Sequence, residues 1–82
     1  MRVVICQNGT MLNAEHISGF TRDGVTIYAH LISGIDPVPI ARYTDIAAML
    51  EAYTELRHAL TDEGTRVGRH VSSDARTIHF DA

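Results

Sequence analysis

Histidine is the residue type in this chain with the widest chemical capacity, and its copies are His16, His30, His58, His70 and His79. None lies three or four residues from another histidine or from the cysteine, so the usual spacings of zinc sites are missing. Glu55 and His58 lie one helical turn apart and could form an acid–base pair. An exposed pair that supports a helix is the more common arrangement. We therefore expect no metal site, no cofactor-binding residue and no catalytic residue.

Two further chemical patterns are also missing. Ser72, Ser73 and Asp74 lie near His70, but no Gly-x-Ser-x-Gly elbow surrounds them. We interpret these residues as a turn. The glycines form neither a Gly-x-Gly-x-x-Gly motif nor a P-loop. The sequence therefore predicts neither hydrolytic activity nor a nucleotide-phosphate loop.

Composition narrows the class of protein. With 82 residues the chain makes one domain. Its formal net charge is −3, and residues 1–64 show no excess of arginine, which argues against a free-standing nucleic-acid binder. Nucleic-acid contact through the arginines of residues 65–82 is the weakest alternative. The chain has no apolar stretch near the ~20 residues of a membrane span, so we expect a soluble protein without a membrane partner.

Cys6 is the one cysteine of the chain. It lies in an apolar run, where a free cysteine behaves as a small buried hydrophobic residue. Lone cysteines without disulfide partners are typical of a reducing compartment. We therefore expect a cytoplasmic protein.

The first forty residues read as strands and turns. The apolar run at 3–6 is followed by Asn8-Gly9, which predicts a type I′ hairpin turn. Gly19 indicates a bulge in the next strand, and Arg22-Asp23-Gly24 indicates a second turn. Residues 25–33 alternate as a strand, and residues 38–42 form a short strand that Pro39 places at a sheet edge.

The segment from 44 to about 61 is the one long helix that the sequence predicts. Thr44 suits the N-cap, and apolar residues recur at three- and four-residue steps. We expect this stripe to pack on the strands. The predicted core consists of Val3, Ile5, Leu12, Ile17, Val25, Ile27, Leu31, Ile46, Met49, Leu50, Tyr53 and Leu56.

Residues 65–82 differ from the preceding domain, residues 1–64. They are rich in polar residues, yet 76–80 alternate like a strand, with Ile78 and Phe80 on one side. We expect this tail either to be disordered or to add a strand to a sheet edge, in its own chain or in a partner's.

The strand at 25–33 has a second face formed by Tyr28, His30 and Ile32. One helix can cover only one face of a sheet, and a large apolar patch left in water is unusual. The alternative is an ordinary surface facing water. We expect these three residues, with Ile78 and Phe80, to form a contact between two copies, because isologous dimers are the commonest closed assembly. Protonation of His30 below about pH 6 would weaken such a contact.

The order of signals resembles the small flagellar proteins called FlbD and similar short bacterial and phage proteins. Asn8-Gly9, Leu12-Asn13, Ile17, Val25-Thr26-Ile27 and Tyr43-Thr44 carry the likeness, over residues 3–60. The resemblance implies a role in motility control without catalytic activity. It supplies no catalytic residue, and the alanine-rich helix and the tail from Thr65 depart from the family's pattern.

These observations predict an α+β fold: an antiparallel meander of three to five strands with the helix packed on one face. The expected function is a small non-enzymatic protein-interaction or regulatory module, a homodimer with an unknown protein partner. The alternative is a small-ligand-binding protein or enzyme whose pocket forms between subunits, where Tyr28, His30 and tail residues converge.

Overall fold

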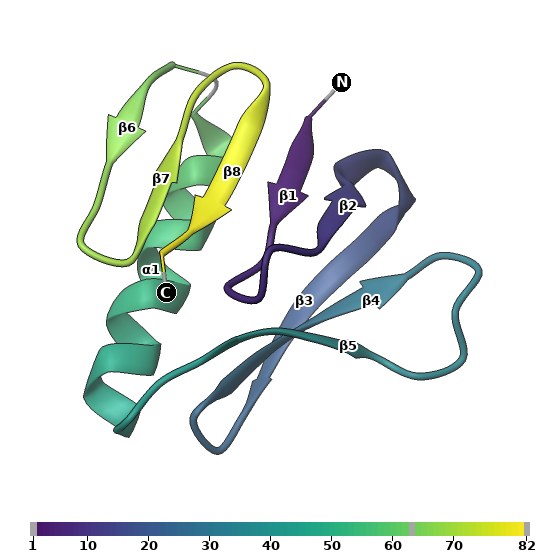
Figure 1. Ribbon diagram of the computed structural model, residues 1–82, viewed down its shortest axis with the longest axis horizontal. Coiled ribbons are helices and arrows are strands. Elements are labelled where there is room, and N and C mark those ends of the chain that lie inside the picture. The colour runs from purple at the N-terminus through teal and green to yellow at the C-terminus, as the bar shows by residue number, and fades with distance from the viewer. Residues whose placement is uncertain (1, 63, 82) are drawn as a thin grey trace.

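The computed structural model describes residues 2–62 and 64–81, which form two β-sheets and one α-helix (Figure 1). The class is α+β, as expected. Within these residues no helix is long and apolar enough to cross a membrane. The elements in chain order are β1 (Val3–Ile5), β2 (Met11–Asn13), a 3₁₀ turn (Ala14–His16), β3 (Ile17–Asp23), β4 (Thr26–Leu31), β5 (Val38–Arg42), α1 (Ile46–Thr61), β6 (Arg66–Val67), β7 (Val71–Ser73) and β8 (Thr77–Phe80).

The larger sheet has five strands in the order β2-β1-β8-β7-β6. β8 pairs in parallel with β1, with Val4 opposite Ile78, whereas the other neighbours are antiparallel. The expectation of a purely antiparallel meander of three to five strands is therefore wrong. A parallel pair needs a long crossover, and here the second sheet and α1 both lie between β1 and β8 in the sequence.

The segment beyond residue 64 is an integral part of this sheet rather than an appendage. It supplies β6, β7 and β8, and β8 lies inside the sheet between β1 and β7 (Figure 1). The alternation expected over 76–80 is confirmed, because Ile78 and Phe80 point into the core while Thr77 and His79 do not.

The smaller sheet is an antiparallel meander, β3-β4-β5. A shift of register between Ile17 and Gly19 confirms the predicted bulge, and β5, which carries Pro39, is an edge strand. The hairpin between β1 and β2 differs from the prediction. Only Gly9 has positive φ there, at 90°, so Asn8 and Gly9 do not form the type I′ turn, which needs positive φ at both residues.

Helix α1 begins one residue later than expected, because the N-cap is Asp45 and not Thr44. The Asp45 carboxylate accepts a hydrogen bond from the Ala48 backbone N–H at 2.7 Å. The helix ends at Thr61, before Gly64. Its buried positions are Met49, Ala52, Leu56 and Ala59.

The buried face of α1 is rotated relative to the predicted stripe. Ile46 and Leu50, both expected in the core, are 58% and 40% exposed. Ala52 and Ala59 take their place against the strands. Alanine has no bulk beyond Cβ, so it lets the helix approach the sheet closely, while Ile46 and Leu50 turn outward.

The core lies between α1, the inner face of the five-stranded sheet and the inner face of β3-β4-β5. Val4 in β1 and Cys6 directly after it are the buried residues here. The prediction that Val3 and Ile5 point into the core is therefore wrong by one residue along the strand. The remaining predicted core residues outside α1 are half-buried, except for Ile27, which is fully buried. The buried hydrophobic set is Val4, Cys6, Ile27, Ala29, Ile40, Ala41, Met49, Ala52, Leu56, Ala59, Val71, Ile78 and Phe80.

Arg2 links the C-terminal end of α1 to the five-stranded sheet. Its guanidinium donates to the carbonyl oxygens of Ala59 at 2.8 Å, Asp62 at 3.1 Å and Asp74 at 3.0 Å. Two of these acceptors lie at the C-terminal end of α1, where the carbonyls lack helical partners and carry partial negative charge. Arg2 therefore caps the helix and fixes it to the β7–β8 turn.

Candidate functional site

The outer face of the β3-β4-β5 sheet carries two of the residues that the sequence predicts for an interface. Ile27 and Ala29 point inward and are fully buried, so Tyr28 and His30 lie on the opposite face of β4, where both are half-buried. His30 Nε2 lies 2.7 Å from the Thr21 hydroxyl oxygen of the neighbouring strand. This hydrogen bond holds the imidazole along the sheet surface.

A hollow of about 350 Å³ indents the same region of the sheet. Tyr28 and Pro39 line it together with Thr26 and Arg42. Ile32 follows the last residue of β4 and is 69% exposed. The face thus has a recess toward the start of β4 and an exposed apolar side chain just past its end.

Ile78 and Phe80, also predicted for the interface, lie elsewhere. Their strand is inside the larger sheet of the same chain, and their side chains are fully buried in its core. They are therefore unavailable to a partner's surface while the chain has this fold. In the single chain Tyr28 and His30 also lie on a different sheet from the residues after 64.

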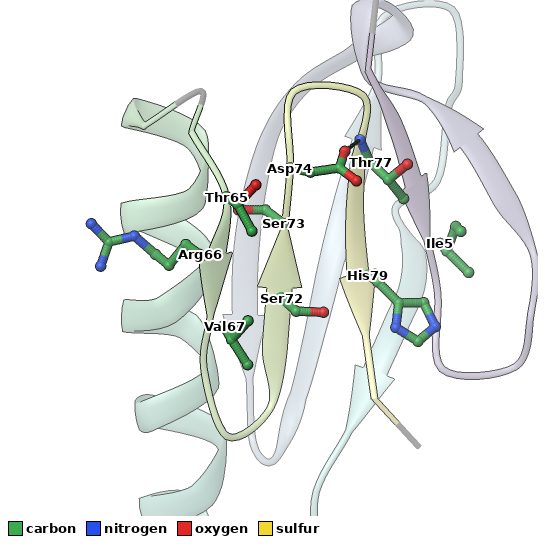
Figure 2. Close-up of a pocket in the computed structure, with 9 residues that line it drawn as sticks. All are labelled: Ile5, Thr65, Arg66, Val67, Ser72, Ser73, Asp74, Thr77 and His79. Atoms are coloured by element: carbon green, nitrogen blue, oxygen red, sulfur yellow. Dashed lines mark hydrogen bonds between the residues drawn. The ribbon is translucent and has the colours of Figure 1, made fainter.

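The outer face of the five-stranded sheet carries a shallow depression of about 340 Å³ (Figure 2). Ser72 and His79 face each other across β7 and β8, with Ile5 beside them. Asp74 does not join them, because its Oδ1 accepts the backbone N–H groups of Arg76 and Thr77, at 2.7 and 2.8 Å. These hydrogen bonds lower the pKa of Asp74. Asp74 thus shapes the β7–β8 turn. Ser72 and Ser73 lie in strand β7, so the interpretation of these three residues as a turn is wrong for the two serines.

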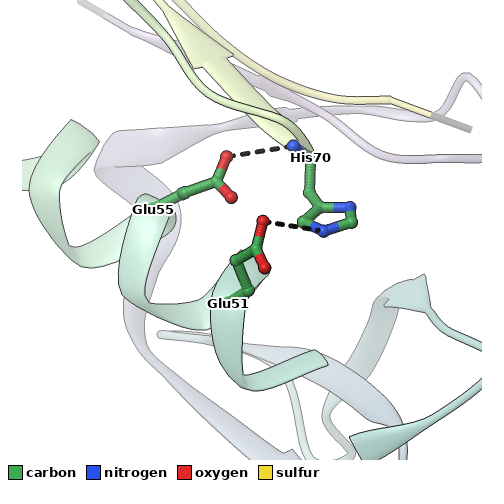
Figure 3. A group of neighbouring side chains, drawn as sticks. All are labelled: Glu51, Glu55 and His70. Carbon is green, nitrogen blue, oxygen red and sulfur yellow. Dashed lines mark hydrogen bonds and ion pairs between the residues drawn. The ribbon is translucent and has the colours of Figure 1, made fainter. Parts of the chain in front are cut away.

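A separate cluster of side chains lies where α1 meets the turn between β6 and β7 (Figure 3). Glu51 and Glu55 come from successive turns of α1, and His70 comes from the turn. Their carboxylate oxygens and the imidazole nitrogen all lie within 4.8 Å of one another. Glu51 Oε1 is 3.4 Å from His70 Nε2, and the three residues are half-buried.

Backbone hydrogen bonds fix part of this cluster. Glu55 Oε1 accepts the N–H groups of His70 at 2.9 Å and Val71 at 3.1 Å. Glu55 therefore reaches across to the sheet and is not the acid–base partner of His58 considered from the sequence. The cluster was missed because its histidine follows Glu55 by fifteen residues, a separation that no motif spacing captures.

Tyr43 stands beside the same cluster. Its ring meets the His70 ring edge-on, with 5.3 Å between the centroids. Its hydroxyl is buried, and no hydrogen-bond partner for it is found in the described part of the chain. Burial, together with the negative charges of Glu55 and Asp81, raises the pKa of Tyr43 to about 12. Tyr43 and His70 line a cleft of about 250 Å³ with Thr44, Ala48 and Arg69.

No protein-family description, curated protein or solved structure matches this chain. The resemblance to FlbD-type proteins stays a prediction.

Proposed function

We propose that this protein is a small non-enzymatic interaction module that acts in the cytoplasm as a homodimer. The contact is the outer face of the β3-β4-β5 sheet. Tyr28, His30 and Ile32 carry it, whereas Ile78 and Phe80 serve the core of each subunit. The observation behind this proposal is a recess beside Tyr28 on β4 together with an exposed isoleucine, Ile32, directly after the last residue of that strand.

In an isologous dimer the same contact occurs twice, so each subunit can place its exposed isoleucine against the recess of the other. Two β4 strands that cross antiparallel about a two-fold axis bring the end of one strand over the start of the other. The exposed Ile32 of each subunit then lies near the recess beside the partner's Tyr28. This arrangement removes two isoleucines and two tyrosine rings from water. Burial of apolar surface favours association, and tyrosine is among the side chains enriched at binding hot spots.

Light scattering after gel filtration tests the proposal at tens of micromolar protein and pH 7.5. The wild type is expected to have twice the monomer mass, and Ile32→Asp is expected to be a monomer. Val67→Asp is the matched control, because Val67 is 83% exposed and lies in β6, at an edge of the larger sheet and not in β3-β4-β5. A monomeric wild type, or equal dissociation by both variants, rules out this interface.

The histidine of the contact supplies a second, independent arm of the test. A charge on His30 within a desolvated contact opposes association, so the dimer is expected to loosen at pH 5.5. Thr21 is the hydrogen-bond partner of the ring, and the charged residues Asp23 and Arg42 lie opposite Thr26, four residues from His30 along β4. His30→Gln is expected to keep its mass at both pH values. An unchanged wild-type mass at pH 5.5 refutes the histidine switch alone.

The recess also favours a second candidate function, a small-ligand-binding protein with its pocket at the subunit contact. Dimerisation would close the open hollow beside Tyr28 and Pro39. In that case crystals of the dimer soaked with small-molecule fragments are expected to show occupancy of this hollow. A hollow filled by the partner's Ile32 leaves the interaction module as the function.

A further inference from the structure

We propose that Glu51, Glu55 and His70 form a binding site for a divalent first-row transition-metal ion of the Zn²⁺ class. One donor atom from each residue lies within 4.8 Å of the other two. The site is separate from the proposed dimer contact, because it lies between α1 and the β6–β7 turn. It departs from the sequence-based expectation of no metal, which considered only spacings along the chain.

The donor geometry is close to what a zinc ion requires. Zinc binds nitrogen and oxygen ligands at about 2.0–2.2 Å, so neighbouring ligands of a tetrahedral site are about 3.3–3.6 Å apart. The 3.4 Å between Glu51 Oε1 and His70 Nε2 already has this length. The remaining donors need to close by an amount of the order of 1 Å, within the reach of a glutamate side chain.

The fold brings these donors together, and backbone hydrogen bonds hold one of them, Glu55, in place. Glu51 and Glu55 lie one turn apart, which places them on one face of α1. Glu55 Oε1 is anchored by the N–H groups of His70 and Val71, and its second carboxylate oxygen is left to bind. Gly68 has no side chain to separate Glu55 from the turn. Preorganised ligands lose little entropy on binding, which favours affinity.

The charge balance also favours a cation. Two carboxylates meet here, and the nearby cation is the guanidinium of Arg69, 3.4 Å from Glu51 Oε1. The Arg69 side chain is 81% exposed, so it can move into water when an ion takes its place. An ion pair this exposed contributes little stability, and its loss offsets little of the binding energy.

The ligand types select the ion. Imidazole nitrogen suits zinc and its neighbours, whereas Mg²⁺ and Ca²⁺ prefer all-oxygen shells. Three protein ligands leave at least one coordination position open. His70 also lines the 250 Å³ cleft, into which that position can open. Tyr43 lines the same cleft, and its buried hydroxyl has no hydrogen-bond partner among the residues that the structure describes.

Competition with a chromophoric zinc chelator at pH 7.5 tests the site on the full chain, after removal of bound metal. The wild type is expected to take up one Zn²⁺ per chain, and excess Mg²⁺ is expected not to displace it. His70→Asn and Glu51→Gln are each expected to weaken binding by well over about tenfold, the lower end of what loss of even an outer-shell partner causes. Circular dichroism confirms that each variant is folded.

His79→Asn is the matched control. His79 Nδ1 and Asp81 Oδ1 are 3.2 Å apart and exposed, but no third donor joins this pair among the described residues. This variant is expected to bind Zn²⁺ as the wild type does. Zn²⁺ is also expected to raise the urea midpoint of the wild type and of His79→Asn, but not of His70→Asn. Absence of binding by the wild type, or equal binding by His70→Asn, overturns the proposal.

Discussion

Gly68 and Glu55 fit together only because Gly68 has no side chain. A Cβ at position 68 would fall onto Glu55 Oε1 and would lie 2.7 Å from the Val71 carbonyl oxygen. Gly68→Ala would therefore displace the carboxylate from the His70 and Val71 N–H groups, leaving those donors unpaired. We expect it to destabilise the fold by about 1–3 kcal/mol, the usual effect of overpacking, measured by urea unfolding.

The control for this substitution is Gly19→Ala. A Cβ at Gly19 meets no atom within 4 Å, and its φ is not in the left-handed region. We expect this variant to be as stable as the wild type or slightly more stable, since alanine restricts the unfolded chain. Equal losses for the two variants would show that the Gly68 contact is relaxed at little cost.

Leu56 and Leu50 compare the inner and outer sides of α1. Leu56 is fully buried, so Leu56→Ala is expected to cost about 2–5 kcal/mol. Leu50 is 40% exposed, so Leu50→Ala is expected to cost less than about 1 kcal/mol. Urea melts of the two variants check the rotation of the helix. A larger loss at Leu50 would place the sequence-predicted stripe against the sheet after all.

Tyr43→Phe removes a buried hydroxyl for which residues 2–62 and 64–81 supply no hydrogen-bond partner, so we expect the variant to be at least as stable as the wild type at pH 7. The raised pKa gives the effect a pH dependence. Above pH 10 the unfolded tyrosine loses its proton while the folded one keeps its proton to about 12. Wild-type stability therefore falls through this range relative to Tyr43→Phe. Urea midpoints from pH 9 to 11.5 measure the gap, and a constant gap contradicts the assignment.

Arg2→Met keeps most of the side-chain stem but removes the hydrogen bonds to three carbonyl oxygens. Hydrogen bonds from charged donors contribute about 1.5–3 kcal/mol, and we expect a loss of about that size. Arg22→Met is the control. Arg22 is exposed and lies 5.8 Å from the Tyr53 ring centre, a contact of about 0.5–1 kcal/mol. Similar urea midpoints for the two variants would mean that Arg2 is not a cap.

Local patterns along the chain predicted much of the fold. Gly19 and Pro39 indicated a bulge and an edge, and the apolar steps around Met49 and Leu56 indicated the helix. It was harder to predict which side chains of each helix or strand point into the core. Val3, Val4, Ile5 and Cys6 are apolar on both sides of the strand, so hydrophobicity alone does not decide which pair points inward. Pairing of Val4 with Ile78 decides it.

The long-range part of the structure was beyond sequence patterns for a similar reason. Arg76 to Phe80 alternates as a strand, but nothing local shows that it enters between β1 and β7 rather than joining an edge. The Glu51–Glu55–His70 cluster depends on that same placement, since β7 carries the turn with His70 across α1. Both halves of the cluster are visible in the sequence, and only the packing of the sheet on the helix brings them together.

The position of β8 also sets the order in which the molecule can form. β1 precedes β8 by more than seventy residues in the chain, yet β8, at Thr77–Phe80, is its parallel neighbour. Until those residues emerge, the apolar strand at 3–5 has β2 on one side and an open edge on the other, a state prone to pairing with other chains. Closure of such a distant pair is entropically slow. The edge of β1 therefore stays open until β8 has been synthesised and has paired with it.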